Sequence, residues 1–397
     1  MSNEFEQRKQ KIADSFFLRP PTAEDLRNEM FDMENNTSWI TLKTNELMTV
    51  PLFKDALSAE DNIKDYSLYD AAANGPGIAI SDGSISPIPL RDIAVKDLLT
   101  TAKVSGSAFK KLLKNDKNAF SNVMNMIFKS SGYKNSKALL RNGKITGILS
   151  ANGGGFDEMP MTYLFDISEK TLKDKFGEIE FIDSFISNEF VESTWALTES
   201  RDDLLQIYAN AVGSSQKHKG LNFMPVARFS TSDTGNSAAC LMPMFRTNEG
   251  INIHIGKGIK VKHVRHGAMS AMDVFADECQ SIYAQYNNLT ETIGKMAKTT
   301  INNPANTYIG ICNKLGISPL YASIPLAELE IITAGRSCNM HDIYLYMLDT
   351  LLYAKEAKRC SEKTLLTLEE TIAKILYLNW KAFDIGGTVA WKNVNIS

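Results

Sequence analysis

The hydrophobic pattern of the chain changes from strand-like to helical spacing near Gly267, and this change restricts the fold. Short apolar runs of strand length lie at 179–186, 192–198, 226–230, 238–245 and 251–266. After Gly267, helical spacing extends over 269–298, 306–315, 341–356 and 361–380. Strands followed by helices, without regular βαβ alternation, favour an α+β fold. We predict a central, mainly antiparallel sheet with helices before it and a C-terminal helical section.

The strongest local signal is the dipeptide Asn142-Gly143 between the apolar runs 138–141 and 145–149. Asn-Gly between two such runs is typical of a two-residue β-hairpin turn. Helical spacing or capping residues predict further helices at 22–33, 90–99, 107–113, 119–128 and 202–211.

Glycine, proline and serine are concentrated in residues 74–89, which indicates a linker or an extended arm. We place a boundary near residue 85 and predict three parts. They are a partly extended N-terminal region, 1–84, a main α+β domain, 85–385, and a tail, 386–397. Within the main domain, we expect 138–266 to be rich in sheet and 267–385 to be helical.

The cysteines and the N-terminus indicate the compartment. Five cysteines, an odd number without a CxxC pair, are expected to be reduced thiols. The first eleven residues are polar, and no apolar run is long enough for a signal peptide or a membrane span. We therefore expect a cytoplasmic protein without a membrane partner, and no motif predicts a cofactor.

Charge is segregated along the chain, although the net charge is only −3. Residues 101–150 contain ten Lys and Arg residues against one acidic residue, and 211–270 contain eight against two. Residues 1–100 and 151–210 are acidic. If the two basic blocks share a face of the folded protein, they create a strong local positive potential.

The candidate binding residues lie in these two blocks. Cationic side chains track a phosphate backbone and release counterions, and interleaved aromatic residues can stack on bases. Ordinary solvated faces of half-buried elements would have the same composition. The first block supplies Lys110, Lys111, Lys114, Lys117, Lys137, Arg141 and Lys144, and the second supplies Lys257, Lys260, Lys262 and Arg265.

Catalytic and metal-binding motifs are weak. His263 and His266 form an HxxH pattern after His254, but no carboxylate or cysteine follows at zinc-ligand spacing. Residues three apart on a strand also point to opposite faces. Gly153–Gly155 is expected to be a hairpin loop, and the hydroxyl-rich run from Ser230 to Ser237 a turn. We predict no metal site and no catalytic residue.

Four segments occur in a characteristic order: PLRDIAVKDLL at 89–99, LLRNGKITGILS at 139–150, STSDTGNSAA at 230–239 and VRHG at 264–267. In this order the chain resembles the phage and plasmid family called domain of unknown function 932, over about residues 85–385. The resemblance implies a mobile-element origin and a link to DNA metabolism, but no established activity. The family usually has an Asp/Arg-Tyr pair after the second segment, where this chain has Ala151–Phe156.

The sequence thus predicts a phage, prophage or plasmid-encoded accessory protein of DNA metabolism that binds nucleic acid through its basic segments. Single-stranded nucleic acid is one form of this prediction. Self-assembly into a homo-oligomer on DNA is a further expectation, because it raises avidity. Two alternatives stay open. One is a protein-interaction module that uses the acidic blocks, and the other is an enzyme whose dispersed site includes His263, His266 and Asp233.

Overall fold

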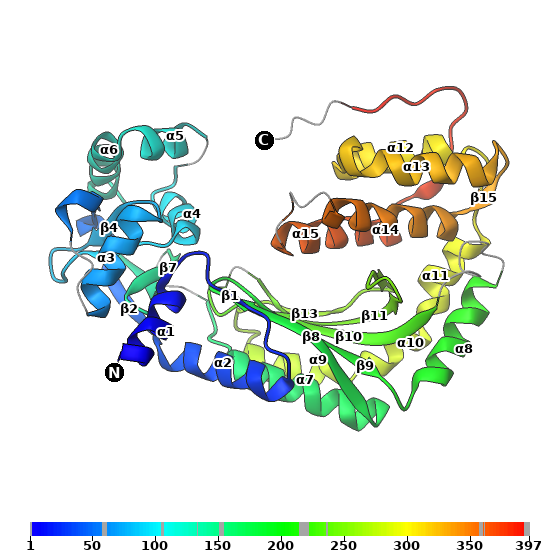
Figure 1. Cartoon of the computed structure of the whole chain (residues 1–397), viewed down its shortest axis with the longest axis horizontal. Helices are drawn as coiled ribbons and strands as arrows, with labels where there is room; N and C mark the ends of the chain where they lie inside the picture. Colours follow the sequence, from blue (N-terminus) through cyan, green and yellow to red (C-terminus); the bar gives the residue numbers. More distant parts are fainter. Residues whose placement is uncertain are drawn as a thin grey trace.

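An antiparallel sheet of seven strands lies at the centre of the computed structural model (Figure 1). The structure describes residues 2–57, 62–104, 107–132, 134–150, 155–213, 222–235, 237–356, 360 and 362–392. The strand order is β1-β8-β9-β10-β11-β12, and β13 also pairs with β11. The strands are β1 (Phe17–Leu18), β8 (Ile179–Ser187), β9 (Val191–Leu197), β10 (Phe223–Thr231), β11 (Ala239–Thr247), β12 (Asn252–His254) and β13 (Ile259–Val261).

One face of this sheet is apolar and packs against helices. Trp195 on β9 and Phe229 on β10 contact the ring of Phe165, with ring centroids 5.3 and 6.0 Å apart. These side chains point to one face because side chains alternate along a strand. The helices on this side are α7 (Met161–Phe176), α8 (Arg201–Val212), α9 (Ala271–Cys279) and α10 (Ile282–Asn287).

The opposite face of the sheet carries polar side chains such as Glu192, Thr194 and Arg228. It lies below the C-terminal helices (Figure 1). Helix α15 (Glu362–Ala373) is nearest to it, beside α14 (Met340–Glu356). The other elements of this part are α11 (Leu289–Lys298), α12 (Pro304–Leu315), α13 (Pro319–Thr333), the short strands β14 (Thr300–Ile301) and β15 (Cys338–Asn339), and two 3-10 turns, Lys374–Tyr377 and Trp380–Phe383.

A second lobe is formed mainly by residues that follow β1 and precede β8 in the chain. Its two small antiparallel sheets have the orders β2-β6-β7 and β3-β4-β5. The strands are β2 (Thr37–Lys43), β3 (Met48–Pro51), β4 (Ile78–Ser81), β5 (Ile88–Pro89), β6 (Asn135–Arg141) and β7 (Lys144–Leu149). The helices before β6 are α1 (Ser2–Ile12), α2 (Ala23–Asn35), α3 (Ile63–Ala73), α4 (Asp92–Thr101), α5 (Ser107–Asn115) and α6 (Lys117–Lys129), with 3-10 turns at Thr44–Glu46 and Lys54–Ala56.

The predicted α+β class is confirmed, including the antiparallel sheet and the C-terminal helical section. The hairpin prediction is also confirmed. Asn142 and Gly143 connect β6 to β7 and have positive φ angles of 48° and 77°. This turn conformation suits Asn and Gly, which explains why the dipeptide was informative.

The boundary predicted near residue 85 does not separate two structural units. Strand β2 pairs with β6, β4 pairs with β5, and β1 joins the large sheet through β8. The described part of residues 1–84 is therefore built into sheets formed with later parts of the chain, and it contains helices as well as extended segments. Amino-acid composition does not indicate which strands pair across the predicted boundary.

Several elements differ from their predicted extents. The segment 251–266 forms only β12 and β13, interrupted around Gly256–Gly258. The helical segment 269–298 is divided into α9, α10 and α11, and the segment 361–380 leaves the α-helical conformation after Ala373. Helices α1, α3, α7 and α13 were not predicted. Of the predicted glycine loop, residues 153 and 154 lie outside the described residues.

Candidate functional site

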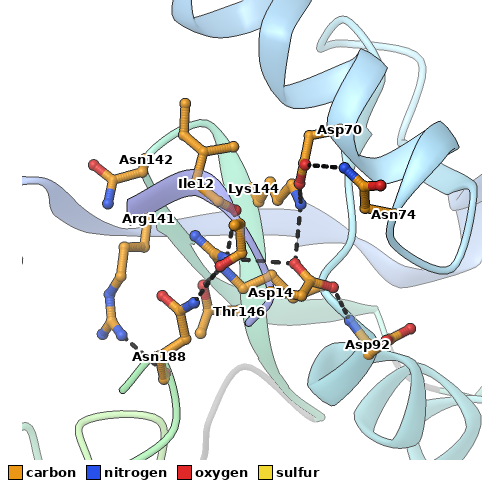
Figure 2. A network of polar contacts seen from close by, with 12 residues as sticks. Ile12, Asp14, Asp70, Asn74, Asp92, Arg141, Asn142, Lys144, Thr146 and Asn188 are labelled. Carbon is orange, nitrogen blue, oxygen red and sulfur yellow. Dashed lines mark hydrogen bonds and ion pairs between the residues drawn. The ribbon is translucent and has the colours of Figure 1, made fainter. Parts of the chain in front are cut away.

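A buried ion network joins the N-terminal segment to strand β7 (Figure 2). The Lys144 side chain is fully buried, and its Nζ lies 2.9 Å from Asp14 Oδ1 and 2.6 Å from Asp70 Oδ2. Arg91 is also buried and donates to the backbone carbonyls of Ile12 and Lys11 at 2.7 and 3.0 Å. Burial lowers the pKa of Arg91 to about 10, so the guanidinium remains charged at neutral pH.

Arg141 lies in the same interior seam, with a side chain only 1% exposed. It donates from Nη1 to the backbone carbonyl of Asn188 at 3.0 Å and forms an ion pair with Asp233. Arg141 and Lys144 were predicted to contact nucleic acid, and the structure corrects this. Both side chains point inward and are paired with buried or nearly buried carboxylates, so a polynucleotide cannot reach them.

The rest of the first basic block lies on three elements. Lys110, Lys111 and Lys114 are exposed on α5, whose Leu113 is buried. Lys117 is half-buried at the start of α6, with its Nζ 3.4 Å from the carbonyl oxygen of Leu52. Lys137 on β6 is partly exposed and lies 3.8 Å from Glu158. Three exposed lysines of the predicted set therefore remain here, all on α5.

The second basic block is more accessible. Lys260 and Lys262 are exposed, whereas Val261 and His263 between and beyond them are buried, as expected from alternation along a strand. Lys257 is exposed in the turn before β13. Arg265 is 75% exposed, with its Nε 3.7 Å from Asp157. All four predicted cations of this block reach the surface.

Lys260 and Lys262 also line a cavity of about 580 Å³, which we call the lysine pocket. Strand register builds its floor, because Ser230 lies beside Cys240 and Cys240 lies beside Lys260 across neighbouring strands. The remaining lining residues are Leu149, Ser150, Phe156, Phe190, Gly235, Ser237, Ala238, His263, Val264 and Glu370.

The lysine pocket has polar and aromatic walls but no activated nucleophile at Cys240. Burial raises the pKa of the Cys240 thiol, so the thiol stays protonated at neutral pH. The ring of His263 stacks on Phe156, with centroids 5.8 Å apart and planes 6° apart. Burial lowers the pKa of His263, which favours the neutral imidazole. This chemistry suits non-covalent binding better than covalent catalysis.

The three histidines of the predicted segment do not converge. His254 is buried under α15 with its Nε2 2.6 Å from Glu369 Oε1, His263 lines the lysine pocket, and His266 is exposed. Within the described residues, no group of three or more His, Cys, Asp and Glu side chains could hold a metal ion. The alternative of a dispersed metal-dependent site gains no support from their positions.

A buried charge cluster under α15 was missed by sequence reasoning. Arg228 Nη1 lies 2.6 Å from Glu369 Oε1, and Arg228 Nε lies 3.8 Å from Glu192. Burial alone raises the pKa of Glu369, but Arg228 and His254 outweigh it and hold this pKa at about 2. Burial raises the pKa of Glu192 to about 7, since the opposing effect of Arg228 is smaller and the carboxylate of Glu369 adds to the rise. The sequence signal that could have indicated this cluster was a charged residue, Arg228, between Ala227 and Phe229 on a predicted strand.

The exposed lysines of α5 do not lie beside the second basic block, whereas Lys137 of the first block pairs across the hairpin with Leu149, which lines the lysine pocket. Helix α5 packs on α6 at the outer end of the second lobe, whereas β13 lies on the large sheet near α15 (Figure 1). The lysine pocket instead collects residues from three of the four ordered segments, 139–150, 230–239 and 264–267. Ser150 ends the second segment, Ser230 and Ser237 belong to the third, and Val264 begins the fourth.

Comparisons with known proteins add no relative. No protein-family model, no curated protein and no solved structure matches this chain. Among the described residues, no helix has both the length and the apolar composition needed to cross a membrane. Function must therefore be argued from the geometry of the pocket.

Proposed function

We propose that this protein binds single-stranded nucleic acid at the lysine pocket, as a cytoplasmic accessory of phage, prophage or plasmid DNA metabolism. The observation that carries the proposal is the presence of Lys260, Lys262, Phe156 and Phe190 around the same cavity. Lysines that neutralise phosphates and aromatic rings that stack on bases are the usual components of single-strand binding sites.

The size of the pocket and its hydroxyl groups suit a nucleotide unit. A volume of about 580 Å³ lies within the range of small-molecule sites in proteins. Ser150, Ser230 and Ser237 place hydroxyl groups on the walls, where they can hydrogen-bond to sugar or phosphate oxygens.

The proposal predicts that the double variant Lys260→Glu/Lys262→Glu binds a fluorescent oligothymidylate at least about tenfold more weakly than the parent protein, a loss of about 1.4 kcal/mol. The salt dependence of binding should also become shallower, by about 0.7 in log–log slope for each lost phosphate contact. Fluorescence anisotropy at several salt concentrations measures both quantities.

Lys173→Glu/Lys175→Glu is the matched control, because both lysines are exposed on α7 at the other face of the sheet. It changes net charge by the same amount and should leave affinity nearly unchanged. If both double variants weakened oligonucleotide binding equally, the interaction would depend on overall charge alone. That result would contradict binding at the lysine pocket.

A second candidate function, protein interaction or self-association, is favoured by helix α13. Its outward face exposes Leu320, Ile324, Ile331 and Ile332, by 53%, 48%, 75% and 61%. Contiguous exposed apolar patches mark interaction sites in many proteins. We expect the parent protein to form a homo-oligomer in sedimentation velocity and Ile324→Glu/Ile331→Glu to dissociate it. A monomeric parent protein would contradict self-association through α13.

A further inference from the structure

A second cavity, here called the arginine pocket, lies between the large sheet and the helices α14 and α15 (Figure 1). It measures about 210 Å³, and among the described residues it has no lining residue in common with the lysine pocket. This space is far larger than the roughly 10–15 Å³ that one water molecule needs. It is smaller than the about 300–1,000 Å³ of sites for drug-sized ligands. The cavity therefore suits a small molecule and is too small for a nucleotide.

The charges around the arginine pocket nearly cancel. The cationic lining residues are Arg19, Arg228, Arg246 and Lys355, and the acidic ones are Asp183, Glu192, Glu249, Glu362 and Glu369. All three arginines already form ion pairs with carboxylates of this set. A ligand with a net charge would upset this balance, so a zwitterionic or neutral ligand matches the pocket.

Two side chains of the arginine pocket have polar atoms without a hydrogen-bond partner. Asn252 is 9% exposed, and its Nδ2 donates to Glu369 Oε2 at 3.2 Å, but its Oδ1 has no partner among the described residues. Arg246 Nη2 lies 2.6 Å from Asp183 Oδ2, whereas Arg246 Nη1 has no partner there. Buried polar atoms left unpaired are costly, so a ligand that supplies the missing partners removes a penalty.

Strand pairing places these two groups next to each other. Arg246 on β11 and Asn252 on β12 are directly opposite across the two strands, so their side chains leave the same face of the sheet. The guanidinium group stays beside the β11–β12 turn, because a Cβ atom at Gly250 would lie 3.7 Å from Arg246 Nη2. One small ligand can therefore accept a hydrogen bond from Arg246 Nη1 and donate one to Asn252 Oδ1.

A third unpaired atom belongs to Glu192, which lines the same pocket from β9. Its Oε2 is buried and has no hydrogen-bond partner among the described residues, since Arg228 Nε is 3.8 Å away. The pocket thus offers two unpaired acceptors and one unpaired donor. An ammonium group carries three N–H donors and matches this excess of acceptors.

Apolar side chains form another part of the wall. Leu351 and Leu352 come from α14, and Leu365 and Leu366 come from α15. Ile251, next to Asn252 in the chain, also lines the cavity and is 6% exposed. These side chains can cover an aliphatic group and exclude water from it.

We propose that the arginine pocket binds an aliphatic α-amino acid, a ligand that lies outside the proposed nucleic-acid function. Its carboxylate accepts from Arg246 Nη1, its ammonium group donates to Asn252 Oδ1, and its side chain packs against the leucines of α14 and α15. The zwitterion adds no net charge to the balanced pocket. Its charge-assisted hydrogen bonds favour it over an uncharged amide of the same size.

Isothermal titration calorimetry with L-leucine, L-isoleucine and L-valine, titrated separately into the full chain, tests the proposal. We expect saturable binding of one molecule per chain for at least one of them. Isocaproic acid has the carbon skeleton of leucine without the ammonium group, and isoamylamine has it without the carboxylate. Each should bind at least about tenfold more weakly than the amino acid.

Arg246→Met removes the proposed carboxylate partner and should weaken amino-acid binding at least about tenfold. It should also abolish the preference for leucine over isoamylamine, which a merely structural role of Arg246 would leave intact. Asp183 is 35% exposed, so its carboxylate stays hydrated, and circular dichroism checks that the variant folds. Arg27→Met is the matched control, because it removes an arginine from an exposed pair with Asp166 outside the pocket.

The proposal is overturned if none of the three amino acids binds saturably, if either analogue binds as tightly as leucine, or if Arg27→Met weakens binding as much as Arg246→Met. The comparison of analogues uses the parent protein alone, so it decides the question even if Arg246→Met fails to fold. Because no polynucleotide is present, all of these outcomes are independent of nucleic-acid binding at the lysine pocket.

Discussion

Replacing Lys144 with methionine is expected to lower the free energy of unfolding by about 3–5 kcal/mol, the usual cost of removing one partner from a buried ion pair. Methionine fills a similar volume but cannot neutralise Asp70, which is itself buried. Asp14 keeps Arg91 as a partner at 3.4 Å, so Asp70 suffers most. Urea denaturation of the purified variant measures the loss.

Lys137→Met provides the control for this prediction, because Lys137 lies on the same hairpin in a partly exposed pair. Its removal should cost no more than about 1 kcal/mol. The double variant Lys144→Met/Asp70→Leu should recover part of the lost stability, since replacing both partners by apolar groups removes the unpaired charge. Equal stability of Lys144→Met and Lys137→Met would show that the network does not hold the N-terminal segment in place.

Glu369→Gln should be the second strongly destabilising substitution, with a loss of about 3 kcal/mol at neutral pH, the equivalent of lowering a carboxyl pKa from 4.5 to about 2. Without this carboxylate, Arg228 would remain buried, with the carboxylate of Glu192 3.8 Å away. Glu362→Gln, on the same helix, is the control. Its partner Arg19 is 51% exposed, so its loss should cost less than about 1 kcal/mol.

The effect of Glu369 should depend on pH with a definite sign. Its pKa is lower in the folded state than the ordinary value of 4.5, so its contribution is complete above pH 4.5. The contribution is lost as the pH falls from 4.5 toward 2. Unfolding free energies of the parent protein and of Glu369→Gln should therefore converge on acidification. A constant difference between pH 6 and pH 3 would be incompatible with an ionised Glu369 at the Arg228 pair.

Local features of the fold could be predicted because their causes lie within a few residues. The Asn142-Gly143 turn and the strands of the large sheet follow from turn chemistry and alternation. Helix α2 follows from Thr22, whose side chain accepts a hydrogen bond from the backbone of Asp25. In each case the signal in the sequence and the contact in the structure involve the same residues.

The omissions have two different causes. Helices α7 and α13 had usable signals, because Pro160 precedes the first and Pro319 begins the second. The burial of Lys144 had no local signal, because its partners Asp14 and Asp70 are 130 and 74 residues away in the chain. Lys144 was therefore assigned to the surface, like the other lysines of the first basic block.

The candidate site was only partly predictable for the same reason. Lys260 and Lys262 were identified from charge and alternation. Their neighbours in the lysine pocket come from β7, β10 and α15, which only the folded chain brings together. A count of charges along the sequence also could not predict that α5 and β13 lie apart in the fold.

Photocrosslinking tests the central claim, binding of a single strand at the lysine pocket, most directly. An oligonucleotide that contains 5-iodouracil is irradiated with the protein, and the crosslinked peptides are identified by mass spectrometry. The account predicts adducts in the peptides that contain Phe156 and Phe190, which disappear in Lys260→Glu/Lys262→Glu. Adducts confined to the lysine-rich helix α5, or no adducts at all, would contradict it.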